Sequence, residues 1–225
     1  MKTIALLLPV WLLLGTYASW GQSRFSVSIN LAPTFSHSNS KSVIPPTNNP
    51  AVPIATATEV LIQSHSLGYS VGLMGHYALT TKWSLSTGVW ATQTQSSQGK
   101  LILNGDAIAL SYSNKHPFHY AYRVPIFVNY QSSTNRISPY FSVGSSADFR
   151  STSYAYINGQ EIPIKLGKPV AISPLLVGAG VIGQLKRQLT LVVQPMLEYD
   201  LQAHPTYTYY HTYQLSLQTQ LRYRF

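Results

Sequence analysis

The sequence contains no cysteine and few charged residues. Without cysteine the chain forms no disulfide scaffold and carries no lipid-accepting cysteine near a mature start, so it is not a lipoprotein. Charged residues make up 9% of the chain, against about 25% in typical soluble domains. Beyond the start of the chain no apolar run is long enough for a membrane helix, and the mean hydropathy is only +0.03. Two classes fit these absences: a transmembrane β-barrel with one face in lipid, or a secreted β-sandwich, which would normally carry more surface charge.

The start of the chain has the order of a secretory signal peptide. Lys2 precedes an apolar run over residues 4–14, and small residues and a polar break follow. We predict a signal peptide over residues 1–21 with cleavage between Gly21 and Gln22, and Ala18/Ser19 as the second choice. A retained membrane anchor is the alternative, but the apolar run is short for a bilayer. The remainder, residues 22–225, has the length of one domain.

The remainder alternates apolar and polar residues with the period of two that a two-faced strand requires. In the first such segment, for example, Val27 and Ile29 flank Ser28. No helical period of comparable length is present. One segment, 169–185, is apolar on both faces, so its register is uncertain. The eight predicted strands cover residues 25–32, 67–77, 83–89, 119–130, 137–151, 169–185, 189–201 and 213–225.

The connections between these segments alternate in length. Short breaks lie at residues 80–82, 131–136 and 186–188. Long ones cover residues 36–64, 97–118, 152–168 and 202–212. Outer-membrane barrels have short periplasmic turns and long extracellular loops. The sequence therefore predicts an all-β fold: an eight-stranded antiparallel up-and-down transmembrane β-barrel in the bacterial outer membrane.

Aromatic residues fall near both ends of the predicted strands, where a membrane barrel places its interfacial girdles. Those expected at the periplasmic rim are Phe25, Trp83, Tyr130, Tyr140, Tyr223 and Phe225. Those expected at the opposite rim are Phe35, Tyr120, Phe149 and Tyr199.

Several strands also resemble a known family. Residues 120–130 (YAYRVPIFVNY) are similar to the aromatic-x-x-I-P-L-L-x-x-Y strand of outer-membrane barrels common in Bacteroidetes, the group that includes PorT-like barrels. The segments PYFSVG at 139–144, VGAGV at 177–181 and LRYRF at 221–225 resemble further strands of that family. The resemblance covers nearly all of the mature chain and implies a barrel scaffold with no catalytic residues. It also implies that Phe225 belongs to a signal read by the barrel-insertion machinery.

Charged residues on predicted inward faces point to a plugged interior. A barrel of eight strands is only wide enough to be filled by side chains, and buried charges persist when they are paired. We therefore predict a structural ionic network in the lumen, with a proton or ion path as the alternative. Its members are Arg123, Asp148, Arg150, Glu198, Asp200, Arg222 and Arg224.

The sequence gives little support for catalysis. It contains neither a G-x-S-x-G elbow nor an H-E-x-x-H motif. His204 and His211 lie near Glu198 and Asp200, so a Ser/His/acid site at the rim is an open alternative. The histidines have no metal-ligand spacing. We expect no enzyme activity, no cofactor and no metal.

The predicted loops carry the best indication of function. Without residues 1–21 the chain has 14 basic and six acidic side chains, a net charge of +8, but no basic run that would suit nucleic acid. Lipopolysaccharide is the expected partner of the loop lysines, beside the outer-membrane lipids. Four tyrosines are expected to extend the last two strands as a contact ribbon, because tyrosine gives large area at low entropy cost. The lysines are Lys41, Lys100, Lys115, Lys165 and Lys168, and the tyrosines are Tyr207, Tyr209, Tyr210 and Tyr213.

These observations predict a non-enzymatic outer-membrane barrel that acts through its extracellular loops, by adhesion or by docking onto an envelope protein. A small-solute pore, an accessory barrel of a secretion system and a rim-located lipid hydrolase are the alternatives.

Overall fold

The computed structural model describes residues 24–44, 58–103, 106–113, 121–149, 153–157, 160–164, 170–200 and 208–225. Within these ranges the regular structure is entirely β, and no helix is long and apolar enough to cross a membrane. The predicted signal peptide lies outside the described residues. The strands are β1 (Phe25–Ile44), β2 (Thr58–Ala78), β3 (Trp83–Leu103), β4 (Asp106–Ser113), β5 (Ala121–Gln131), β6 (Ile137–Phe149), β7 (Ser153–Ile157), β8 (Gln160–Ile164), β9 (Val170–Gln184), β10 (Leu189–Asp200) and β11 (Tyr209–Arg224).

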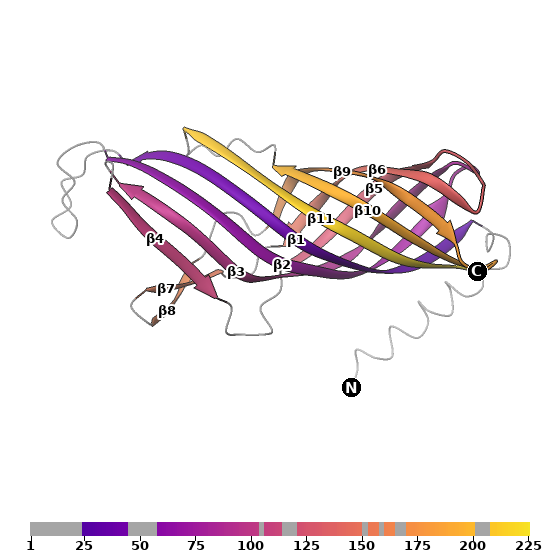
Figure 1. Ribbon diagram of the computed structural model, residues 1–225, viewed down its shortest axis with the longest axis horizontal. Coiled ribbons are helices and arrows are strands. Elements are labelled where there is room, and N and C mark those ends of the chain that lie inside the picture. Colours follow the sequence, from indigo (N-terminus) through magenta and orange to yellow (C-terminus); the bar gives the residue numbers. More distant parts are fainter. Residues whose placement is uncertain are drawn as a thin grey trace.

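Eight of these strands close into a ring. Each pairs antiparallel with its neighbours in the order β1-β2-β3-β5-β6-β9-β10-β11, and β11 pairs back with β1. β4 pairs with the far end of β3, and β7 and β8 form a separate hairpin. Figure 1 shows the strands running obliquely around one long barrel. The predicted fold class, an eight-stranded up-and-down β-barrel, is confirmed.

The strands on one side are much longer than the sequence predicted. β1, β2 and β3 have 20 or 21 residues, whereas β5 has 11 and β10 has 12. Together with β4 and the start of β11 they project beyond the ring as an extended sheet (Figure 1). The prediction that residues 36–64, 97–118, 152–168 and 202–212 are loops was therefore wrong in part. Where the projection begins, residues 36–42, 63–66 and 95–100 are almost all polar, so the apolar alternation is interrupted although the backbone pairing continues.

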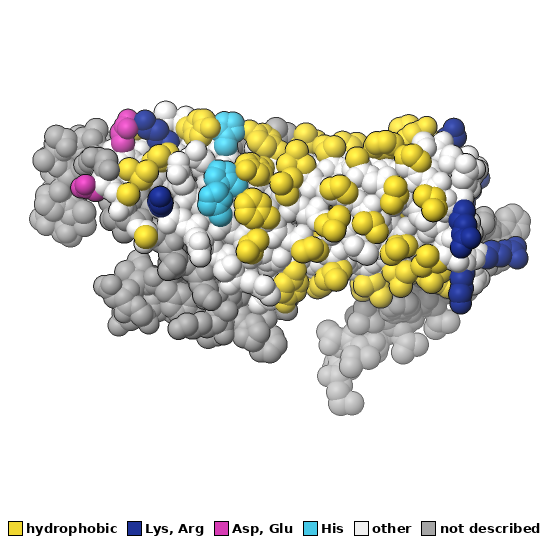
Figure 2. All heavy atoms as spheres, viewed as in Figure 1, with side chains coloured by type: hydrophobic (Ala, Val, Ile, Leu, Met, Phe, Trp, Pro, Cys, Tyr) yellow, Lys and Arg dark blue, Asp and Glu magenta, His cyan; other side chains and the backbone are white. Residues whose placement is uncertain are grey.

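The barrel wall is apolar outside and largely polar inside. Outward side chains such as Ile29 and Leu73 are well exposed, the latter at 66%, whereas Ser28, between outward neighbours on β1, is buried. Figure 2 shows the resulting band of hydrophobic side chains over the barrel, with basic residues at one end. An exposed apolar surface of this extent is rare on soluble monomers and is the expected surface of a barrel in lipid.

Aromatic rings border this band at the end with the short turns. Ring centroids of Phe25 and Phe225 lie 6.1 Å apart, and those of Trp83 and Tyr130 lie 4.8 Å apart. Tyr140, which was expected in the same girdle, is instead 1% exposed and points into the lumen. It occupies an inward position of β6, and its neighbour Phe141 takes the outward one and stacks on Tyr130 at 6.5 Å.

The opposite rim is less regular. Phe35 and Phe149 are exposed there, as the predicted girdle requires, and Tyr199 contacts His211 on the neighbouring β11. Tyr120 lies outside the described residues.

At Gly180 the backbone of β9 lies very close to that of β10, which permits a test of how tightly the barrel wall is packed. A Cβ atom on Gly180 would lie 2.2 Å from the carbonyl oxygen of Val193 and 2.6 Å from Cα of Gln194, so the two strands would have to separate. We expect Gly180→Ala to lower the free energy of unfolding by about 1–3 kcal/mol, measured by urea titration of the protein folded in lipid vesicles. Gly183→Ala, on the same strand, is the control, because its Cβ would meet nothing closer than 3.9 Å. Equal effects of the two substitutions would contradict this account.

Candidate functional sites in the lumen and at the barrel ends

The lumen is filled in layers, and β10 contributes to each of them. We call the end of the barrel with the turns at residues 79–82, 132–136 and 185–188 the turn end, and the opposite end, where β1, β2 and β3 project, the long-loop end. Alternate residues of β10 face inward. From the long-loop end to the turn end they are Glu198, Met196, Gln194, Val192 and Thr190. Glu198 belongs to an ionic cluster, Met196 to an apolar layer and Gln194 to a layer of amides and hydroxyls. Val192 packs with Tyr140 and Ile182, and Thr190 lines a cavity at the turn end.

The ionic cluster is centred on Arg123 of β5. Its Nη1 atom donates to both carboxylate oxygens of Glu198, at 2.8 and 2.6 Å. Its Nε atom lies 3.5 Å from Oδ1 of Asp148, which also accepts a hydrogen bond from Ser146. The side chains of Arg123 and Glu198 are only 17% and 14% exposed, so the charges compensate each other with little help from water. Asp200 lies close enough to contribute to the electrostatic potential at Arg123 and at Glu198.

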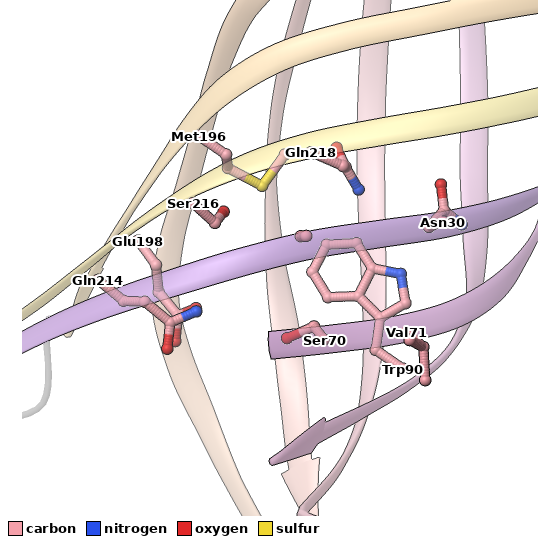
Figure 3. Close-up of a pocket in the computed structure, with 10 residues that line it drawn as sticks. Asn30, Ser70, Val71, Trp90, Met196, Glu198, Gln214, Ser216 and Gln218 are labelled. Atoms are coloured by element: carbon pink, nitrogen blue, oxygen red, sulfur yellow. The ribbon is translucent and has the colours of Figure 1, made fainter. Parts of the chain in front are cut away.

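Beside this cluster an apolar layer closes the lumen. Its members are Met74, Trp90, Phe127, Leu176 and Met196, and all five are buried. The void between this layer and the ionic cluster measures about 10 Å³, the space of roughly one water molecule. Figure 3 shows the side chains around it, from strands on opposite sides of the barrel. The five side chains of the apolar layer therefore occupy much of the lumen at this height.

The next layer is held by direct hydrogen bonds between strands. Gln194 Nε2 donates to Gln218 Oε1 at 2.5 Å. Ser142 Oγ lies 2.9 Å from Asn129 Oδ1 and 3.1 Å from Gln194 Oε1. These contacts link four strands, β5, β6, β10 and β11, through the interior.

The predicted lumen network is divided between the two ends of the barrel. Arg123, Asp148 and Glu198 gather at the long-loop end, whereas Arg222 is buried near the turn end and Arg224 is exposed there. The expectation of one network that includes both groups was therefore wrong. The pairing of β10 with β11 explains the separation, because Glu198 is opposite Gln214 and Arg222 is opposite Thr190, eight residues further along. Arg150 lies outside the described residues.

Arg222 has partners of its own. Its Nη2 atom donates to the hydroxyl of Tyr140 at 2.9 Å and lies 3.4 Å from Gln220 Oε1. The guanidinium also lies over the Tyr140 ring, 5.5 Å from the ring centre. These contacts fix the guanidinium at the inner end of a cavity that the sequence analysis did not anticipate.

This turn-end cavity has a volume of about 470 Å³ and opens between the short turns. Polar side chains of the turns and of the strand ends form its wall. Its basic lining residues are Arg24, Lys82, Arg136, Arg187, Arg222 and Arg224. A run of basic residues in the sequence would have revealed it, but these six are spread over the chain and meet only in the closed ring.

At the long-loop end the outward face carries a tyrosine–histidine patch. We define it by Tyr199 of β10, Tyr209, His211 and Tyr213 of β11, His37 of β1 and His65 of β2. The rings of Tyr209 and His211 lie 4.4 Å apart, and those of His37 and Tyr213 lie 5.2 Å apart. His37 and His65 bring their Nδ1 atoms within 3.0 Å. Figure 2 shows histidine side chains at the edge of the hydrophobic band, toward the end with the long strands.

The predicted contact tyrosines are only partly on this surface. Tyr209 and Tyr213 belong to the patch, Tyr210 occupies the opposite face of β11, and Tyr207 lies outside the described residues. The ribbon that they form pairs mainly with β1, from Lys41 opposite Tyr209 to His37 opposite Tyr213. Its pairing with β10, the predicted partner, includes Tyr199 opposite Tyr213, and residues 201–207 lie outside the described residues.

The candidate catalytic histidines do not form a recognisable site in the described part of the chain. His211 contacts Tyr199 through its Nδ1 atom, and His204 is not described. His76 forms a 2.8 Å hydrogen bond with Ser28, but both are buried and no carboxylate joins them in the described structure. Among the described residues no group of three or more His, Asp or Glu side chains could hold a metal ion.

The class that the geometry defines is a closed eight-stranded β-barrel with a filled lumen. No family model matches the sequence. No curated protein matches it either. Among solved structures, Neisserial surface protein A (NspA) is similar at 13% identity, with a TM-score of 0.46, covering 89% of this chain and 97% of its own. Outer membrane protein OprG from Pseudomonas aeruginosa has 10% identity and a TM-score of 0.43, covering 91% and 97%. Ail of Yersinia pestis, the attachment invasion locus protein, has 14% identity and a TM-score of 0.41, covering 89% and 99%.

Proposed function

We propose that the protein is an integral outer-membrane barrel without enzymatic activity, which acts through contacts made at its long-loop end. The observation that carries this proposal is the extension of β1, β2, β3 and β11 past the hydrophobic band on one side only. On the other side the strands end in turns of a few residues. A structure built only to span the membrane has no need of the projection, so we assign the role of the protein to it.

The tyrosine–histidine patch supports a contact role. It joins the hydrophobic band to the projection, and it combines aromatic area with polar atoms that can bind head groups or protein. Lys41 and Lys100 lie on the same projection, where they can meet the phosphates of lipopolysaccharide. Lipopolysaccharide and a neighbouring envelope protein are the partners that we propose for this end.

Other proposals have less support. A small-solute pore would need the apolar layer of the lumen to open, and an accessory role in a secretion system rests only on the resemblance to PorT-like barrels. A hydrolase at the rim would need His211 to give up its contact with Tyr199.

Phe225 is exposed at the turn end, as a signal for the insertion machinery would require.

The absence of native cysteine permits a direct test of orientation. We expect Val43→Cys on the projection to react with a membrane-impermeant maleimide on intact cells, because Val43 is exposed beyond the hydrophobic band. Thr81→Cys in the turn before β3 should react only after the outer membrane is broken. Labelling is read on a gel of boiled and unboiled samples, where a folded barrel migrates differently. Labelling of Thr81→Cys on intact cells, or recovery of the protein in the periplasm, would overturn the proposal.

The contact role is tested by a photo-crosslinking residue placed at Tyr209. We expect adducts with lipopolysaccharide or with one envelope protein in living cells. The same residue at Leu73, in the middle of the hydrophobic band, is the matched control and should give neither adduct. Equal crosslinking patterns from the two positions would argue against a specific surface at the long-loop end.

A further inference from the structure

The turn-end cavity is basic without any compensating carboxylate side chain in its lining. Five arginines and one lysine contribute to its wall. The remaining lining residues are uncharged, such as Ser26, Thr80 and Gln131, and His76 lies at the inner end. Cations confined to a concave site raise the local concentration of anions, because their fields add within the low-dielectric wall. Five of these cations are exposed to solvent, whereas Arg222 is buried, so an anion at the inner end would meet Arg222 away from bulk water.

The charge distribution along the barrel makes this cavity distinct from the rest of the molecule. All six acidic residues of the chain lie at the other end of the strands or beyond them: Glu59, Asp106, Asp148, Glu161, Glu198 and Asp200. Arg123, the cation of the lumen's ionic cluster, is paired there with carboxylates. Among the described residues no carboxylate side chain lies at the turn end.

The inner end of the cavity holds donors that lack partners. Arg222 is 9% exposed and oriented by Tyr140, and its Nε atom has no hydrogen-bond partner in the described part of the chain. The same is true of Nδ1 of His76, which is 2% exposed. In the tautomer that accepts from Ser28 at Nε2, this Nδ1 atom carries a hydrogen. Buried donors of this kind normally have an acceptor, so they indicate where an anionic oxygen would bind.

The chemistry favours phosphate over a simple halide. Arginine forks match the tetrahedral oxygens of a phosphate with two parallel hydrogen bonds, and five of the six cations are arginines. A volume of about 470 Å³ is within the usual range of small-ligand sites, and it is larger than one phosphate group requires. The cavity lies inside the ring of strands, so a soluble anion can enter it, whereas a lipid would have to bend its head group over the rim.

We propose that the turn-end cavity binds a phosphate-bearing anion, with Arg222 at the inner end and Arg187 and Arg224 at the entrance. This site is at the opposite end from the proposed contact surface and does not depend on it. The phosphate can come from a soluble compound or from a lipid head group at the rim. The shared chemistry is a phosphate held by several guanidinium groups.

The test is calorimetric titration of inorganic pyrophosphate into the mature protein in phosphatidylcholine nanodiscs. We expect saturable binding to one site, weakened at least about tenfold in the double variant Arg187→Gln/Arg224→Gln, because each charge-assisted hydrogen bond contributes strongly. Both residues are exposed, so the variant should fold, as its gel mobility will show. Arg222→Gln is less suitable, because it also removes the contact with Tyr140.

Lys186→Gln is the matched control, since Lys186 lies beside Arg187 in the same turn but does not line the cavity. Its pyrophosphate affinity should stay within about twofold of the wild type. No binding to the wild type, or an equal loss in the control and the double variant, would overturn the proposal.

Repeating the titration in nanodiscs that contain phosphatidylglycerol distinguishes a soluble phosphate compound from a lipid head group as the source of the phosphate. Unchanged affinity assigns the site to a soluble phosphate compound, and competition by the lipid assigns it to a head-group phosphate.

Discussion

Replacing Arg123 with methionine should lower the free energy of unfolding by about 3–5 kcal/mol, the usual cost of leaving a buried charge without its partner. Methionine fills similar space, but it leaves Asp148 and Glu198 together in the lumen without the cation that now lies between them. Urea titration of the barrel in lipid vesicles, followed by gel mobility, measures the loss.

The control for this experiment is the exposed ion pair between Lys41 and Glu59. Their atoms lie 3.0 Å apart, but the side chains are 38% and 64% exposed. Lys41→Met should therefore change stability by less than about 1 kcal/mol. A double variant Arg123→Met/Glu198→Gln should be more stable than Arg123→Met alone, because one uncompensated charge is removed. If Arg123→Met is as stable as the control variant, the ionic cluster does not hold the long-loop end of the lumen together.

The second large effect is expected on the outer surface. Leu73→Arg places a cation near the middle of the hydrophobic band, flanked by Ile29 and Val89 on the neighbouring strands. In lipid this should cost about 2–4 kcal/mol of folding free energy, the range for arginine near the bilayer midplane. The measurement is again urea titration in vesicles, together with the fraction of protein that reaches the outer membrane.

Val43→Arg is the matched control for Leu73→Arg. Val43 is also an exposed aliphatic residue, but it lies on the projection, opposite Glu59. Its replacement should cost less than about 1 kcal/mol, since water reaches the new charge. If Leu73→Arg is harmless and Val43→Arg is damaging, the hydrophobic band is not the surface that faces lipid.

The architecture could be predicted from the sequence because a membrane barrel imposes a strict alternation on every strand. Each of the eight predicted strands is present, including 169–185, the segment that is apolar on both faces. There Leu176 and Ile182 face the lumen while Val177 and Val181 face outward. The extent of the strands could not be predicted in the same way. Just beyond the band, the polar segments 36–42, 63–66 and 95–100 interrupt the pattern that marks a strand, although the pairing persists.

The assignment of faces was harder than the assignment of strands. Hydrophobicity does not distinguish residues that face lipid from residues that face the lumen. Trp90 and Phe127 are as apolar as the residues of the outer band, but they are buried in the interior. Tyr140 was expected at a rim for the same reason. Its inward position depends on the register of β6, and its role depends on Arg222, which is 82 residues away in the sequence.

For the charged residues too, the sequence indicates which ones face inward but not how far along the barrel each one lies. The cluster of Arg123 with Asp148 and Glu198 consists of inward charges on β5, β6 and β10, and the alternation of the sequence predicts all three to face the lumen. Arg222 was included as well, but its height in the lumen is fixed by the pairing of β11 with β10. The turn-end cavity could not be predicted, since it is formed by residues from both chain ends and three separate turns.

The pairing of β1 with β11 has a consequence for biogenesis. The seam between the first and last strands runs from Ser26 opposite Arg224 to Lys41 opposite Tyr209, so it is among the longest in the ring. Until β11 has been synthesised and delivered, β1 keeps an unsatisfied edge over its whole length, and such edges recruit other strands. Closure of the ring therefore requires β11, which covers this edge of β1 from Ser26 to Lys41.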